Sequence, residues 1–149
     1  MGADLYINQL YEPQRQKWEP LFEKAARTRD RLPAGSEEHR RAQARVEECY
    51  ANMKAEGYFR DSYNDWNLLW KFGLSWWSDV IPMLNQESEL PVEAVKSLLA
   101  MLEERENVFQ RELEALPVKE QDSFRRRHKD FEKFLKRAID LNVPILASL

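Results

Sequence analysis

Residues 57–84 read GYFRDSYNDWNLLWKFGLSWWSDVIPML, and we expect the rest of the fold to pack around this stretch. It holds four of the five tryptophans, and eight aromatic residues lie between Tyr58 and Trp77. From Trp66 to Leu84 the apolar residues fall on nearly every side of a helical wheel. Helices that are apolar all round are usually buried at the centre of a protein. We therefore predict that this segment is the buried element of the fold.

Two short helices are expected within the buried segment. Gly73 followed by Ser75 indicates a break and a new N-cap, and Pro82 restricts the second helix. Lys71 and Asp79 interrupt the apolar residues, whereas about twenty predominantly apolar residues are needed to cross a bilayer. The sequence therefore favours a soluble protein that does not span a membrane.

Helices are also expected before this stretch. Apolar residues recur at helical spacing over residues 13–32, where Pro20 should kink the helix or move its start later. Ser36 is a good N-cap for a second helix that ends near Gly57. Only Leu5 to Ile7 resembles the period-2 pattern of a strand, so one short edge strand is the alternative there.

A helical hairpin is expected at the C-terminus. Apolar residues follow the spacing of a coiled-coil seam from residue 91 to 116, and Pro117 separates this seam from a second one. The first helix is mainly acidic and the second mainly basic, so each complements the other. Glu106 and His128 are at matching levels of the two seams and could pair. Residues 145–149 form an apolar tail that should dock on the body.

The predicted fold class is all-α, a compact bundle of four to six helices with a C-terminal antiparallel helical hairpin. The length fits one helical domain, residues 1–149, in which the first two helices and the hairpin surround the aromatic segment. The formal net charge of −3 gives no overall field that would recruit nucleic acid or an anionic membrane. The only cysteine, Cys49, cannot form an intramolecular disulfide, and the first thirty residues lack a signal-peptide pattern. A cytoplasmic location is therefore expected.

The candidate ligand-binding site is the polar segment that precedes the aromatic helices. A small number of polar groups that converge beside aromatic rings is typical of small-molecule pockets. The alternative is structural, because capping residues and an internal bridge from Arg60 to Asp61 or Asp65 would use the same residue types. The structural interpretation is favoured over the binding site. The candidate residues are Tyr58, Arg60, Asp61, Tyr63, Asn64 and Trp66.

Other candidates for chemistry are weaker. The basic run from Arg125 to Lys129 could contact phosphates, but acidic residues interrupt it and a solvated helix face explains it better. Cys49 lies in an apolar helical stripe and fits a buried hydrophobe better than a nucleophile. A polar layer that fixes the hairpin register explains Glu106 and His128 better than an acid–base or metal half-site. The chain has none of the common catalytic, phosphate-binding or metal-binding motifs, so we expect no catalytic residue, no metal and no cofactor.

A family resemblance is carried by the opening MGADLY, by GYFRDSYN and by the following LLW and GLSWW. These motifs resemble a family of bacterial proteins with no assigned function. The resemblance implies no activity, cofactor or partner. It does suggest that Asp4, Tyr6 and Asn8 are neighbours of the YFRDSYN segment.

Two functions remain open from the sequence. The favoured one is a non-catalytic helical interaction module that binds a protein partner or a second copy of itself, and its mark would be a contiguous exposed apolar patch. The alternative is a small-molecule binding protein or enzyme with a pocket at the YFRDSYN segment. The absence of a local catalytic signature makes an enzyme the less favoured reading.

Overall fold

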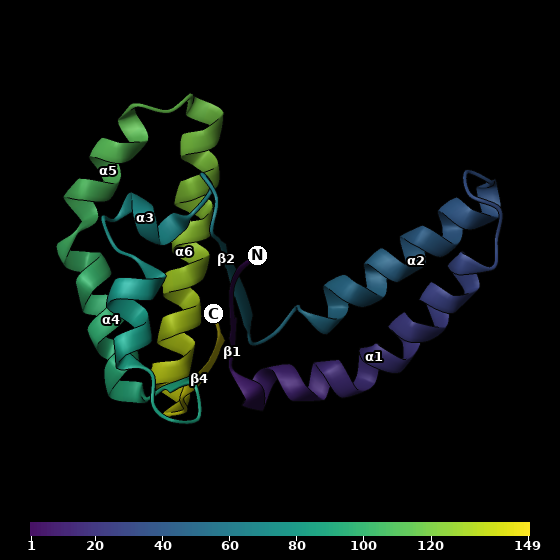
Figure 1. The fold of residues 1–149 in the computed structure, drawn as a ribbon, viewed down its shortest axis with the longest axis horizontal. Coiled ribbons are helices and arrows are strands. Elements are labelled where there is room, and N and C mark those ends of the chain that lie inside the picture. Colours follow the sequence, from purple (N-terminus) through teal and green to yellow (C-terminus); the bar gives the residue numbers. More distant parts are fainter. The chain divides into compact units, whose positions relative to one another are not determined.

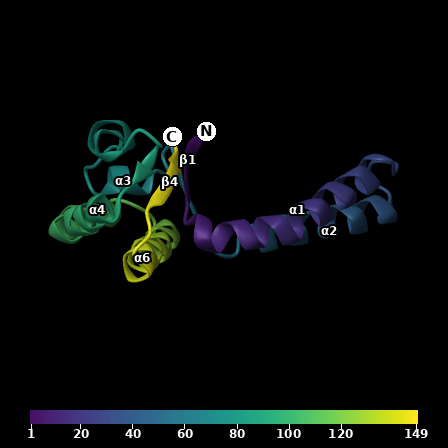
Figure 2. The same cartoon turned by 90° about the horizontal axis from the view of Figure 1, so that it is seen from below.

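The computed structural model describes all 149 residues, which separate into two compact units. Residues 8–58 form the first unit, which we call the N-terminal hairpin. Residues 1–7 and 59–149 form the second unit, which we call the body. Figures 1 and 2 show the elements of both units. We predicted a single domain in which the first two helices cover the aromatic segment, and both statements stay predictions.

The N-terminal hairpin consists of two helices, α1 (Asn8–Asp30) and α2 (Glu37–Met53) (Figure 1). Ser36 is the N-cap of α2 as predicted, since its Oγ accepts the amide of His39 at 3.1 Å. The predicted start of α1 was wrong, because the helix begins at Asn8 and contains both Pro13 and Pro20.

Few side chains are buried within the N-terminal hairpin. They are Ala25, Val46, Cys49 and Met53. Across the two helices, Arg29 donates from Nη1 to Oε1 of Gln43 at 3.0 Å. The ring centroids of Phe22 and Tyr50 are 5.9 Å apart. Cys49 is fully buried and free, in agreement with its interpretation as a small hydrophobic residue.

The body contains a four-stranded sheet, so the prediction of a purely helical fold was wrong, although the chain is mainly helical. The strands are β1 (Gly2–Tyr6), β2 (Tyr58–Ser62), β3 (Glu89–Leu90) and β4 (Ile145–Ser148), in the order β2-β1-β4-β3. β4 is antiparallel to β1, with Leu5 opposite Ala147, and antiparallel to β3, with Leu90 opposite Ile145. The N-terminal strand is therefore in the interior of the sheet and the C-terminal tail docks as its partner.

Alternating burial explains why such short segments form strands. Ala3 and Leu5 of β1 and Ile145 and Ala147 of β4 are buried, while the residues between them are more exposed. Gly2 is required by a close approach, because a Cβ at this position would clash with the backbone carbonyl oxygen of Asp61 on β2.

The C-terminal hairpin is present, and it packs against the sheet. Its helices are α4 (Val92–Glu104), α5 (Glu106–Glu114) and α6 (Val118–Leu141), with a break at Arg105 that the sequence analysis did not predict. The rings of Phe59 on β2 and Phe131 on α6 stack with centroids 4.6 Å apart. The acidic helices α4 and α5 and the basic helix α6 have complementary charges, but no ion pair joins α4 or α5 to α6. The ion pairs of this region each lie within a single helix.

The aromatic segment forms a four-residue helix, α3 (Leu68–Lys71), a π-helical turn, η1 (Trp76–Val80), and a 3-10 turn, η2 (Ile81–Met83). The predicted break and cap are both confirmed. Gly73 has a φ of 70°, and Oγ of Ser75 accepts the amides of Trp77 and Ser78.

The prediction that this whole segment is buried was only partly right. Six side chains are buried in the body: Leu68, Leu69, Phe72, Leu74, Trp76 and Val80. The other three tryptophans of the segment are exposed, Trp66 by 44%, Trp70 by 67% and Trp77 by 59%. Because the elements here are single turns, each presents one flank to the core and another to solvent.

Candidate binding site

Asp61 is at the centre of a buried cluster, which we call the Asp61 cluster. Its side chain is fully buried and accepts five hydrogen bonds. Oδ1 accepts the amides of Ser62 and Leu68 at 2.9 and 2.8 Å and Nη2 of Arg127 at 2.7 Å. Oδ2 accepts the amide of Leu69 at 3.1 Å and Nε1 of Trp76 at 2.7 Å.

This geometry makes Asp61 a structural residue, because both carboxylate oxygens are already fully used by groups of the protein. The carboxylate joins β2 to the first amides of α3, to the η1 turn and to α6. Arg127 compensates the charge, and its Nη1 also donates to the carbonyl oxygen of Trp66. The predicted bridge from Arg60 to Asp61 or Asp65 was wrong, because Asp61 pairs with Arg127.

Arg60 lies outside this cluster, on the exposed face of the sheet. Its Nη1 donates to both carboxylate oxygens of Asp4 on β1, at 3.1 and 3.2 Å. Asp4 is therefore a neighbour of the YFRDSYN segment, as the resemblance suggested. Tyr58 belongs to the N-terminal hairpin, where Nζ of Lys54 is 3.8 Å from its ring centroid.

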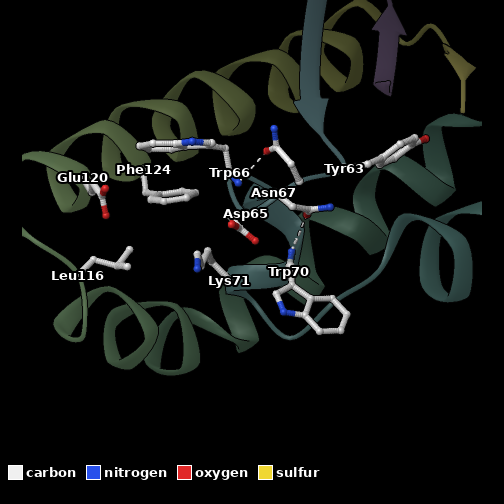
Figure 3. Close-up of a pocket in the computed structure, with 10 residues that line it drawn as sticks. Tyr63, Asp65, Trp66, Asn67, Trp70, Lys71, Leu116, Glu120 and Phe124 are labelled. Atoms are coloured by element: carbon white, nitrogen blue, oxygen red, sulfur yellow. Dashed lines mark hydrogen bonds between the residues drawn. The ribbon is translucent and has the colours of Figure 1, made fainter.

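Several of the residues that follow Asp61 in the chain line an open pocket of about 700 Å³ (Figure 3). The loop before α3, α3 itself, the turn before α6 and the first two turns of α6 supply its walls. The lining residues are Tyr63, Asn64, Asp65, Trp66, Asn67, Trp70, Lys71, Leu116, Glu120 and Phe124. We call this site the aromatic pocket.

Two stacked rings form one end of the aromatic pocket. The rings of Trp66 and Phe124 have centroids 5.6 Å apart and planes inclined by 21°. Nζ of Lys71 is 5.3 Å from the Phe124 centroid, within the range of a cation–π contact. Trp66 is also held through its carbonyl oxygen by Arg127, so the Asp61 cluster positions this wall of the pocket.

The two asparagines of the pocket use their oxygens for the local fold. Oδ1 of Asn64 accepts the amide of Trp66 at 2.9 Å, and Oδ1 of Asn67 caps α3 by accepting the amide of Trp70 at 2.9 Å. Figure 3 shows both bonds. Their side-chain amide groups, like the indole N–H groups of Trp66 and Trp70, make no hydrogen bond within the protein.

Three charged side chains of the pocket have no ion-pair partner. They are Asp65, Lys71 and Glu120. All of the ion pairs nearby belong to other residues, including those of Arg125 with Asp122 and of Arg127 with Asp61. The pocket therefore presents two carboxylates without an ion-pair partner and one ammonium group that is in contact with the Phe124 ring.

Tyr63 connects the aromatic pocket to a further exposed tryptophan. The ring centroids of Tyr63 and Trp77 are 5.9 Å apart. The Tyr63 hydroxyl is buried and has no hydrogen-bond partner. Burial, followed by the charges of Asp4 and Asp61, raises the pKa of Tyr63, while Arg60 acts in the opposite direction. The hydroxyl is therefore neutral in the folded protein.

The expected pair of Glu106 and His128 is not present in the structure. Glu106 is exposed and accepts from Gln110, whereas His128 is buried with its ring against Phe72 and Phe109. Nε2 of His128 lies 3.3 Å from Glu132 on its own helix, without the geometry of a hydrogen bond. No group of three or more His, Cys, Asp or Glu side chains is placed to hold a metal ion.

Three of the six residues chosen from the sequence line the aromatic pocket, namely Tyr63, Asn64 and Trp66, whereas Tyr58, Arg60 and Asp61 do not. The sequence analysis missed seven lining residues: Asp65, Asn67, Trp70, Lys71, Leu116, Glu120 and Phe124. The first four continue the same polar and aromatic run, which was a usable signal. Of the last three, Leu116 lies in the turn before α6, whereas Glu120 and Phe124 lie in α6. No local pattern in the sequence placed them beside the aromatic segment.

None of the helices has the length and apolar character required to span a membrane. No family model, curated protein or solved structure matches the chain.

Proposed function

We propose that the body is a protein-interaction module that binds a segment of a partner protein at the aromatic pocket. The observation that carries this proposal is the exposure of Trp66, Trp70 and Trp77 at and beside one open pocket. Tryptophan is enriched at the energetic centres of protein interfaces. The proposal includes a cytoplasmic location, which the single free cysteine supports.

The structure of the pocket supports binding over a purely structural role. The Asp61 cluster holds the fold, and Trp70 and Trp77 are 67% and 59% exposed, so the rings of these two tryptophans are not part of the core. Removing the Trp70 side chain should change the free energy of unfolding by no more than about 0.5 kcal/mol, the usual range for surface positions. A partner could therefore bind the pocket through these exposed rings and through the three charged side chains that have no ion-pair partner, Asp65, Lys71 and Glu120.

The test is a selection of random displayed peptides on the wild-type protein, followed by binding to three variants. We expect the selected clones to lose binding to Trp66→Ala and Trp70→Ala and to keep it with Trp18→Ala. Trp18 is a matched control, because it is the only tryptophan of the N-terminal hairpin. The proposal is wrong if no clone depends on Trp66 or Trp70 while both variants remain folded by circular dichroism.

A small-molecule site is the second candidate, and one observation favours it. The pocket volume of about 700 Å³ is within the range of ligand pockets, and Asp65, Lys71 and Glu120 are free to bind polar groups. A thermal-shift screen against metabolites tests it. A compound that raises the midpoint of the wild type but not of Lys71→Ala would favour this second function.

A further inference from the structure

We infer that the aromatic pocket binds an extended, proline-containing segment that carries a basic residue. This inference depends on the proposed function and names the chemical class of the partner. It follows from three properties of the pocket: the spread of its rings, the excess of unpaired donors and the two unpaired carboxylates.

The rings of the pocket are spread out and do not converge on one point. In Figure 3 the stacked pair of Trp66 and Phe124 lies at one end, while Trp70 and Tyr63 lie apart from it and from each other. A cage for a single cationic group needs rings that face a common centre. Separated rings instead form ridges, and an extended chain can place successive side chains between them.

The unpaired polar groups of the pocket are mostly donors. The indole N–H groups of Trp66 and Trp70 and the amide N–H groups of Asn64 and Asn67 have no partner in the protein. A polyproline II segment is the matching ligand. It has no internal hydrogen bonds, so all of its carbonyl groups can accept, and its proline residues contribute no N–H. A helix would present few free carbonyls, and an added β-strand would need an exposed strand edge.

The charges of the pocket select a basic residue in the ligand. Asp65 and Glu120 are unpaired carboxylates, while the ammonium group of Lys71 already lies over the Phe124 ring. A Lys or Arg of the partner could therefore pair with either carboxylate, while the one cation of the pocket is already in contact with the Phe124 ring. Arg is the better match, because its planar group pairs with a carboxylate through two parallel bonds.

The experiment is to sequence the displayed peptides that bind the wild type and fail to bind Trp70→Ala. We expect enrichment of proline with a neighbouring Arg or Lys. The most enriched peptide is then synthesised with a fluorescent label and titrated by polarisation. Its affinity should fall about tenfold or more when its prolines are replaced by alanine, and also in the double variant Asp65→Asn with Glu120→Gln. The variant Asp122→Asn is the charge control, because Asp122 lies outside the pocket on α6.

Other outcomes would overturn the inference and separate it from the proposed function. Pocket-dependent clones that lack proline, such as amphipathic helical sequences, would contradict the inference and leave the interaction module standing. The complete absence of pocket-dependent clones would contradict both. An oligosaccharide from a glycan array that binds the wild type, but not Trp70→Ala, would contradict both the inference and the proposed function. The pocket would then be a carbohydrate site, because sugars stack on exposed tryptophan rings.

Discussion

At the residue scale, Asp61 matters most for stability. Replacement by alanine leaves Arg127 and Nε1 of Trp76 without their acceptor, together with three backbone amides. Breaking a buried charge pair in this way should cost about 3–5 kcal/mol of unfolding free energy. Urea denaturation of Asp61→Ala measures this loss. Asp65→Ala is the control, because Asp65 is exposed and unpaired, and it should change stability by less than about 0.5 kcal/mol.

Tyr63 is the second residue with a measurable consequence. Its hydroxyl is buried without a partner, so Tyr63→Phe should keep or raise stability, by up to about 1 kcal/mol. Because the folded-state pKa is raised above the ordinary value of 10.0, the unfolded chain loses this proton first as the pH increases. The stability of the wild type should therefore fall relative to Tyr63→Phe above about pH 10 and not below it. Parallel thermal melts from about pH 8 to about pH 11 test the sign.

The local caps were predictable at this scale, and the Asp61 cluster was not. Ser36, Gly73 and Ser75 were assigned correctly, because a cap or a left-handed turn depends on residues a few positions away. Arg127 is 66 positions from Asp61, and it is one of several arginines in a basic run. Only the folded backbone selects this one as the partner of the carboxylate.

At the element scale, the pairing of β1 with β2 depends on Gly2. A Cβ at this position would clash with the carbonyl oxygen of Asp61, so Gly2→Ala should force β1 away from β2. We expect a cost of about 1–3 kcal/mol, as for other overpacked sites. Ser148→Ala is the control, since Ser148 is an exposed residue of β4. Equal midpoints for the two variants in urea denaturation would contradict this role of Gly2.

The helical elements were largely predictable, and the sheet was not. The helix α2 and the C-terminal hairpin were predicted correctly, because their apolar residues repeat at helical spacing over many turns. The strands have two to five residues and pair the two ends of the chain, as Leu5 with Ala147 shows. Segments this short have no clear period, and a pairing over such a distance in the sequence leaves no local signal.

At the scale of the whole molecule, the fold separates the residues that hold the body from those available to a partner. The Asp61 cluster ties together β2, α3, η1 and α6. The same contacts position the wall of the aromatic pocket, because Arg127 binds the carbonyl oxygen of Trp66. The polar and aromatic run that was predicted from the sequence lines part of the pocket, but Leu116 in the turn before α6 and two residues of α6, Glu120 and Phe124, complete it. The prediction therefore reached one side of the pocket and missed the other.

The most direct measurement is the affinity of the most enriched displayed peptide for the wild type, Trp70→Ala and Trp18→Ala. Unfolding midpoints are recorded for the same samples. We expect Trp70→Ala to bind the peptide about tenfold or more weakly at an unchanged unfolding midpoint, while Trp18→Ala binds like the wild type. Equal affinities for all three proteins would contradict this expectation, since the exposed tryptophans of the pocket would then have no part in recognition.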